Sequence, residues 1–227
     1  MTITGTITAG PDIPTRMDDG ALLTLTQWLS PAFPLGAFAY SHGLEAAVAA
    51  GHVADGDTLA DWVRGVIVHG SGLSDAVLLV HVMEGGDPDD AAAIARALCA
   101  SAGRLRETDE MGAAFARTLA AMTGTARAPH PLPVALGLAA RPLGLPPVTA
   151  ASLYLQSFAS NQIACALRAM PLGQAAGQGI LAALAPAIGR TARASAHGDP
   201  ARIVTCAFGA DIAAMRHETL QPKVFAT

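Results

Sequence analysis

Alanine accounts for 50 of the 227 residues, and this abundance limits the secondary structure that the chain can adopt. Alanine costs the least free energy to place in a helix, whereas strands favour β-branched and aromatic side chains. Aromatic residues make up only 4% of the chain, and no segment shows a sustained alternation of polar and apolar residues. The composition therefore predicts an all-α protein.

The length and the hydrophobic content predict one folded domain. Hydrophobic residues make up 52% of the chain and charged residues 14%, which excludes disorder for most of its length. A chain of 227 residues can bury one sizeable core. We therefore predict a single-domain bundle of nine or ten helices over residues 19–219. A disordered N-terminal tail is expected at 1–18 and a short C-terminal tail at 220–227.

Helical periodicity and helix breakers place the individual helices. The clearest amphipathic pattern predicts a helix over 57–69, with Asp57 or Thr58 as its N-cap. Pro186 is expected to kink or split the last long helix. A final helix should follow the Asp199-Pro200 pair. The other helices are expected at 22–29, 41–51, 74–84, 88–101, 104–122, 132–140, 148–170 and 174–195.

The charged and metal-binding residues lack the spacing that most catalytic sites need. Lys223 is the only lysine, so no phosphate-binding loop can be formed, and the scattered arginines exclude a nucleic-acid footprint. The seven histidines show no metal-site spacing. Cys99, Cys165 and Cys206 are far apart and are interpreted as reduced core residues of a cytosolic protein. The sequence predicts a non-enzyme without metal or cofactor.

The mean hydropathy is positive, so membrane insertion needs to be considered. The N-terminus has neither the basic nor the apolar region of a signal peptide, which favours a cytoplasmic protein. Residues 142–167 carry no formal charge and are long enough to span a bilayer. However, Gln156, Asn161 and Gln162 would need internal partners in lipid. We interpret this segment as a buried helix and expect no membrane contact.

Two groups of residues are better suited to contact than to chemistry. Phe33, Phe38 and Tyr40 lie in a loop stiffened by two prolines, where they could dock a partner or pack on the chain's own core. These two interpretations remain equally open from the residues alone. The second group is a candidate dimer contact or water-lined passage made of small and amide side chains, namely Ser157, Asn161, Gln174 and Gln178.

Residues 30–45 read SPAFPLGAFAYSHGLE, and this segment resembles the N-terminal signature of the UreF family of urease accessory proteins. Further similar motifs follow in the same order along nearly the whole chain. They are RLRETDEM at 104–111, HPLP at 130–133, and PLGQ at 171–174 followed by Gly177-Gln178.

The resemblance implies an all-α homodimer that binds a second accessory protein, UreD (also called UreH). The two proteins would recruit the nickel-carrying GTPase UreG and the urease apoenzyme, so that nickel reaches the active site. The family motifs assign partner binding to residues of the loop, the charged helix and the C-terminal end: Phe33, Pro34, Gly36, Phe38, Tyr40, Ser41, Glu45, Arg104, Arg106, Glu107, His217, Glu218 and Phe225.

The C-terminal end departs from the family pattern. Gln221, Lys223 and Ala226 stand where the family commonly has tyrosine and two arginines, so the contacts of those groups are in doubt here. Two alternative functions are kept for test. One is a metal-binding protein that uses His and Cys side chains, and the other is a small membrane-associated helical protein.

Overall fold

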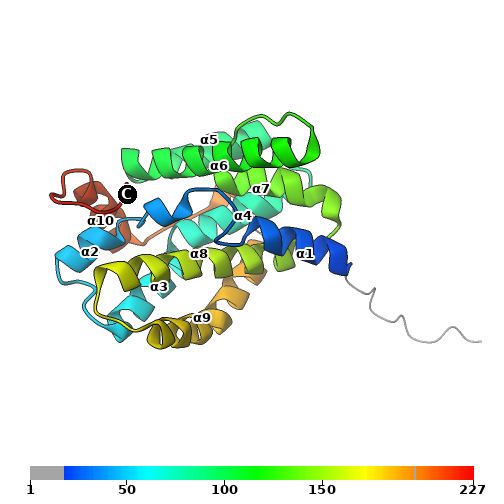
Figure 1. Cartoon of the computed structure of the whole chain (residues 1–227). Helices are drawn as coiled ribbons and strands as arrows, with labels where there is room; N and C mark the ends of the chain where they lie inside the picture. Colours follow the sequence, from blue (N-terminus) through cyan, green and yellow to red (C-terminus); the bar gives the residue numbers. More distant parts are fainter. Residues whose placement is uncertain (1–17, 197) are drawn as a thin grey trace, which may run out of the picture.

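The computed structural model describes residues 18–196 and 198–227, which form ten α-helices, three short 3₁₀ helices and no strand. The all-α prediction is confirmed for this part of the chain. The helices pack into one bundle with α4 and α8 through its middle (Figure 1). The α-helices are α1 (Asp19–Trp28), α2 (Leu44–Ala49), α3 (Gly56–His69), α4 (Ser71–Met83), α5 (Pro88–Ala97), α6 (Ala102–Thr123), α7 (Leu132–Ala140), α8 (Pro147–Ala169), α9 (Gln174–Ser195) and α10 (Phe208–His217).

Short polar side chains begin several helices by accepting hydrogen bonds from free backbone N–H groups. The Asp18 carboxylate accepts from the amide of Gly20 at 2.9 Å at the start of α1. At the start of α3, Asp55 Oδ1 accepts from the amide of Thr58 at 2.9 Å, and Thr58 Oγ1 accepts from the amide of Asp55 at 3.0 Å. The N-cap of α3 is therefore Asp55, two residues before the predicted Asp57. Such a cap contributes about 1 kcal/mol to stability.

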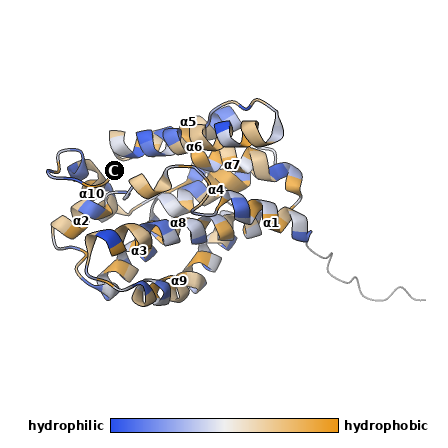
Figure 2. Ribbon diagram, viewed as in Figure 1, coloured by the Kyte–Doolittle hydropathy of each residue, from blue (hydrophilic) through white to orange (hydrophobic). Residues whose placement is uncertain are grey.

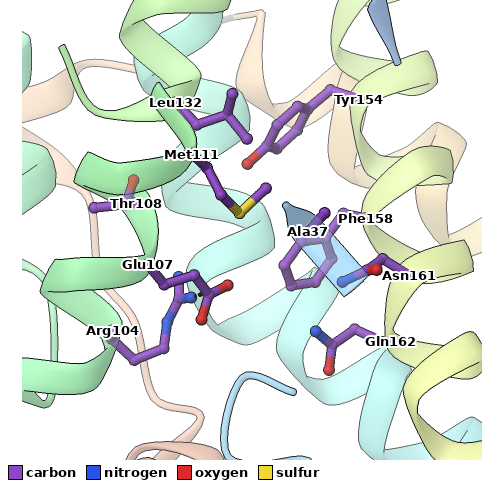
Figure 3. Close-up of a pocket in the computed structure, with 10 residues that line it drawn as sticks. All are labelled: Ala37, Arg104, Glu107, Thr108, Met111, Leu132, Tyr154, Phe158, Asn161 and Gln162. Carbon is purple, nitrogen blue, oxygen red and sulfur yellow. Dashed lines mark ion pairs between the residues drawn. The ribbon is translucent and has the colours of Figure 1, made fainter. Parts of the chain in front are cut away.

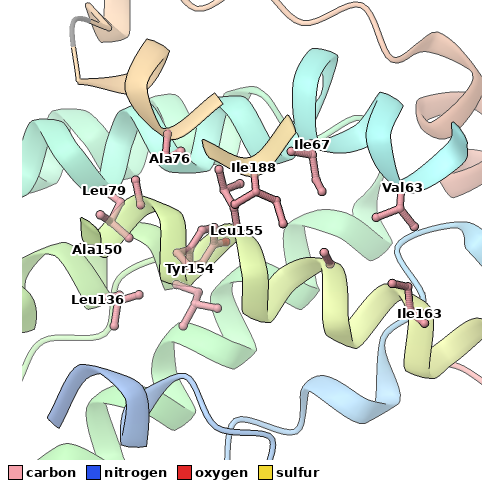
Figure 4. Packing of buried hydrophobic residues seen from close by; sticks show 14 of the residues in the cluster. Val63, Ile67, Ala76, Leu79, Leu136, Ala150, Tyr154, Leu155, Ile163 and Ile188 are labelled. Carbon is pink, nitrogen blue, oxygen red and sulfur yellow. The ribbon is translucent and has the colours of Figure 1, made fainter. Parts of the chain in front are cut away.

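The core lies where α8 packs along α9 and α4 packs against α7 and α8. Figure 4 shows aliphatic side chains from α3, α4, α7, α8 and α9 meeting there. Each fully buried Leu, Ile or Val contributes about 1.5–3 kcal/mol through removal of apolar surface from water. The labelled aliphatic residues of this cluster, all at most 4% exposed, are Val63, Ile67, Leu79, Leu136, Leu155, Ile163 and Ile188.

Small residues let backbones approach closely inside the bundle. A Cβ atom at Gly112 of α6 would lie 1.8 Å from the carbonyl oxygen of His130. At Gly137 of α7 it would lie 2.8 Å from the carbonyl oxygen of Leu79 in α4. Real Cβ contacts do not reach such distances, so these crossings require glycine. The interior therefore depends on small side chains as much as on large ones.

The helix boundaries differ from the predicted ones mainly at turns. The bounds of α7 and α9 agree with the prediction, and Pro186 does not split α9. Helix α2 begins at Leu44, three residues later than predicted, because His42 and Gly43 adopt left-handed backbone conformations. Helix α5 ends at Ala97 rather than at 101.

The apolar surface of the helices faces inward. In Figure 2 the ribbon of α7 is largely hydrophobic, whereas α6 above it carries strongly hydrophilic stretches. Within the described residues, Gly56–Met83 has the length and apolar composition to cross a membrane, but Gly70 breaks its helix and 67% of its most apolar window is buried in the fold. Burial of this kind is typical of core helices. Residues 142–167, which were considered as a membrane span from the sequence, do not have the length and apolar composition of a membrane-spanning helix in the structure.

Candidate functional site

The segment 30–45 joins α1 to α2 and lies across α8. Its backbone carbonyls accept hydrogen bonds from side chains of α8. Ser157 Oγ donates to the carbonyl of Leu29 at 2.8 Å, and Asn161 Nδ2 and Cys165 Sγ approach the carbonyl of Tyr40 at 3.4 and 3.3 Å. Ser157 and Asn161, predicted for a dimer or passage surface, therefore hold the chain's own loop.

Three residues of this loop have backbone angles in the left-handed region. Gly36 (φ 75°) precedes the 3₁₀ turn Ala37–Ala39, and His42 (φ 57°) and Gly43 (φ 79°) precede α2. A Cβ atom at Gly43 would lie 2.6 Å from the backbone nitrogen of Ala214 in α10. Gly43 thus allows both the turn and the close approach of α10.

The three aromatic residues of the loop point in different directions. Phe33 is buried, and its ring centroid lies 5.7 Å from that of Phe115. Tyr40 is also buried and donates a hydrogen bond to the carboxylate of Glu110. Phe38 is 70% exposed. Phe33 and Tyr40 therefore pack on the chain's own core, and Phe38 is left exposed for contact with a partner.

A buried charge network lies beneath the loop. Arg104 and Glu107 form an ion pair, one turn apart on α6, and both are more than nine-tenths buried. The Nδ1 atom of His42 lies 3.4 Å from the Glu107 carboxylate, while its Nε2 lies 2.6 Å from Ser71 Oγ. Thr227 Oγ1 donates to Glu107 Oε2 at 2.7 Å. In this conformation Arg104 and Glu107 support the loop and do not form a contact surface.

Burial and neighbouring charges determine the protonation states of the side chains in this network. Burial alone would raise the pKa of Glu107, but the Arg104 guanidinium and the hydrogen bond with His42 hold it at about 2. Burial and the Arg104 charge lower the pKa of His42 to about 4. Burial raises the pKa of Asp75 to about 6, against the Arg104 charge and a 2.7 Å hydrogen bond from Tyr154. At neutral pH the centre is an ionised Arg104–Glu107 pair beside a neutral histidine.

Glu45 ties the C-terminal end to α2 and α10. Its carboxylate lies 2.7 Å from His217 Nε2 and accepts from the amides of Val224 at 2.6 Å and Phe225 at 3.1 Å. Burial would raise the pKa of Glu45, but these three hydrogen bonds lower it below its ordinary value. His217 is 2% exposed, so its role here is to anchor Glu45.

The last residues also pair with the loop along the backbone. The amide of Ala226 donates to the carbonyl of Ala39, and the amide of Ser41 donates to the carbonyl of Thr227, each at 2.7 Å. Ser41 is fully buried by this contact. Residues 224–227 therefore hydrogen-bond to the segment 39–45 and form part of the support of the loop.

Arg168 of α8 joins the loop to the C-terminal end on the outside. Its guanidinium donates to the carbonyl of Phe38 at 2.5 Å and lies 4.5 Å from the ring centroid of Phe225. Phe225 is buried by this contact, while Val224 beside it is 81% exposed. We call the exposed residues gathered here the loop–tail surface, namely Phe38, Arg168, Lys223, Val224 and Ala226.

The remaining predicted residues lie apart from this cluster or at its edge. Pro34 and Arg106 are exposed, and Arg106 acts on the pKa of Tyr40 through its charge. Glu218 accepts from the amide of Ala102 at 2.8 Å and so caps α6. Gln174 and Gln178 are exposed on α9, whereas Ser157 and Asn161 of α8 contact the loop.

Sequence reasoning missed several members of the cluster. His42 was not singled out from the segment 30–45, and its place between Ser41 and Gly43 was the signal that could have marked it. Asp75 lies in the predicted helix 74–84, which is apolar nearly all round, and Arg168 is a single charge near the end of the predicted helix 148–170. Each of the three has at least one partner that is more than 60 residues away along the chain.

The described residues contain no group of three or more His, Cys, Asp or Glu side chains placed to hold a metal ion. All three cysteines are free. Burial raises the pKa of the Cys99 and Cys165 thiols to about 11, which disfavours the reactive thiolate. Cys206 is exposed, in contrast to the core position predicted for it.

The fold and this cluster define an all-α protein whose polar groups mainly support one exposed loop. The family model for UreF matches residues 53–185. A urease accessory protein UreF of Cereibacter sphaeroides (strain ATCC 17029) is 52% identical over 207 residues, covering 91% of this chain and 99% of that protein. UreF proteins of Jannaschia sp. (48% identity, covering 92% and 95%) and Paracoccus denitrificans (44%, covering 91% and 96%) are also similar. The chain belongs to the UreF family of urease accessory proteins, and its role is in urease maturation.

Proposed function

We propose that this protein is a non-catalytic scaffold that binds the accessory protein UreD (UreH). Together they recruit the nickel-carrying GTPase UreG to the urease apoenzyme, so that nickel is inserted into the active site. The observation that carries the proposal is the loop–tail surface, in which the family signature presents an exposed phenylalanine on a rigid support. Nickel is cargo in this scheme and needs no resident site in the chain.

The rigidity of the loop–tail surface supports a docking role. The backbone around Phe38 is held by two hydrogen bonds. The Arg168 guanidinium donates to the carbonyl of Phe38, and the amide of Ala226 donates to the carbonyl of Ala39. A preorganised aromatic side chain loses little conformational entropy on binding. Arginine and exposed apolar side chains next to it are typical of protein interfaces. The partner should therefore offer an apolar pocket with an acidic rim.

Co-purification tests the proposal directly. The full chain, carrying an affinity tag, is co-expressed with its cognate UreD and purified at low ionic strength. We expect a stoichiometric complex that also retains UreG when UreG is added. Failure to retain UreD under these mild conditions, with both proteins folded, would reject the scaffold proposal.

A metal-binding protein remains the alternative from another class, with His217 beside Glu218 as its most suggestive sequence feature. His217 is instead engaged by Glu45 in the interior. Equilibrium dialysis of the isolated chain against nickel separates the two functions. We expect binding no tighter than that of a His217→Gln variant, whereas tight stoichiometric binding would favour the alternative.

The scaffold is proposed to act in the cytoplasm as a homodimer, through the exposed face of α9 that carries Gln174 and Gln178. The glycine-rich start of this helix leaves space for a close neighbour, because a Cβ at Gly173 or Gly179 would meet no atom within 4 Å.

The other alternative function is that of a membrane-associated protein. Such a protein would need detergent for extraction, and fractionation of cell lysate tests this.

A further inference from the structure

A small cavity of about 50 Å³ lies between α6 and α8, beneath the 3₁₀ turn of the loop (Figure 3). Ala37 closes it on the loop side, and Met111, Leu132 and Phe158 form much of its apolar wall. Arg104 and Glu107 reach it from α6, and Gln162 reaches it from α8. The cavity thus brings polar groups of two facing helices to one small space.

Two polar atoms at this cavity lack hydrogen-bond partners. In residues 18–196 and 198–227, three buried side-chain nitrogen or oxygen atoms are unpaired in this sense, and two of them belong to the cavity lining. One is Oε1 of Gln162, whose side chain is 1% exposed. The other is Nη1 of Arg104, which is in direct ion-pair contact with Glu107 Oε1, so Gln162 Oε1 is the atom of the two that has no partner. Native proteins rarely leave such groups unsatisfied.

The polar groups that line the cavity determine which kind of ligand it can bind. An anion would meet the Glu107 carboxylate, a cation would meet the Arg104 guanidinium, and an apolar molecule would leave the Gln162 oxygen unsatisfied. Water donates and accepts, so one molecule can serve the Gln162 oxygen and the Arg104 nitrogen at once. A bound water needs roughly 10–15 Å³ of cavity measured in this way, so about three to five molecules fit.

We propose that this cavity binds ordered water that hydrogen-bonds to Gln162 and links it to the Arg104–Glu107 pair. The water connects α8 to α6 below Ala37 and so forms part of the support of the loop. Gln162 is a positioning residue in this arrangement, since it acts on the loop through the water.

Water-selective NMR of the full chain tests the proposal. We expect cross-peaks between the water resonance and the Met111 methyl group, with the sign of long-lived bound water. Gln162→Leu, which keeps the bulk and removes the amide, should abolish them. Gln156→Leu on the same helix, outside the cavity lining, should leave them unchanged. Cross-peaks that are absent in the wild type, or that persist in a folded Gln162→Leu variant, would overturn the proposal.

A crystal structure of the wild-type chain gives a second test that needs no variant. The proposal requires a density peak at about 2.7–3.2 Å from both Gln162 Oε1 and Arg104 Nη1. A structure in which Gln162 instead bonds to a protein group, with no peak in the cavity, would reject it.

Discussion

At the scale of single residues, burial determines how much an ion pair affects the stability of the protein. The Arg104–Glu107 pair has side chains 10% and 7% exposed, whereas those of the Arg64–Asp61 pair are 47% and 75% exposed. Water screens the outer pair, so it contributes little. The inner pair has lost its hydration, and removing one partner leaves the other charge uncompensated. The two pairs therefore provide a comparison within one molecule.

Glu107→Gln should destabilise the protein by about 3–5 kcal/mol, because it leaves the Arg104 charge buried without its ion-pair partner. Asp61→Asn is the matched control and should cost less than about 1 kcal/mol. Urea unfolding followed by circular dichroism measures both free energies of unfolding. Equal losses for the two variants would show that the inner pair is not buried in solution.

The low pKa of His42 makes stability depend on pH. Its folded value of about 4 lies below the ordinary value of 6.5, so folding favours the neutral ring. The stabilisation is fully present above pH 6.5 and is lost as pH falls from 6.5 towards 4. The full shift corresponds to about 3 kcal/mol.

His42→Asn should flatten this part of the pH profile, since asparagine tolerates the left-handed backbone and does not titrate there. Unfolding free energies of both proteins at pH 7, 6, 5 and 4 provide the measurement. Wild type should lose more stability than His42→Asn over this range. Parallel profiles would mean that His42 does not enter the fold as a neutral buried group.

At the scale of elements, the contact between α6 and the start of α7 depends on one glycine. Gly112→Ala should destabilise the protein by about 2 kcal/mol or more, because the new Cβ would lie 1.8 Å from the His130 carbonyl. Gly65→Ala in α3 is the control, since a Cβ there meets nothing within 4 Å. It should stabilise the protein by about 0.5–1 kcal/mol. Thermal unfolding that moves in the same direction for both variants would contradict this packing.

Some helix boundaries could be predicted from the sequence and others could not. Helix bounds such as those of α7 and α9 follow from local signals, namely breakers and apolar periodicity. The start of α2 could not be predicted, because the left-handed angle of His42 depends on its contacts with Glu107 and Ser71. For the same reason the signature marked Phe33, Phe38 and Tyr40 as important but did not separate them. Which ring is buried depends on where α6 and α8 lie.

At the scale of the whole molecule, the proposed dimer depends on the exposed face of α9. The double variant Gln174→Glu/Gln178→Glu introduces two like charges in each copy, which face their equivalents if α9 lies at a two-fold axis. Light scattering should then show the molar mass of a monomer. Gln27→Glu, an exposed position on α1, should keep the dimer. A dimer that persists in the double variant would place the contact elsewhere.

The central claim is that the loop–tail surface docks UreD, and one pair of variants tests it most directly. Phe38 and Phe208 are both phenylalanines on the surface, 70% and 68% exposed, so replacing either with serine leaves the core intact. The affinity of each variant for UreD is measured by isothermal titration calorimetry. We expect Phe38→Ser to weaken binding about tenfold or more, a loss of about 1.4 kcal/mol, and Phe208→Ser to bind as wild type does. Unchanged affinity of Phe38→Ser, or an equal loss in both variants, would contradict the claim.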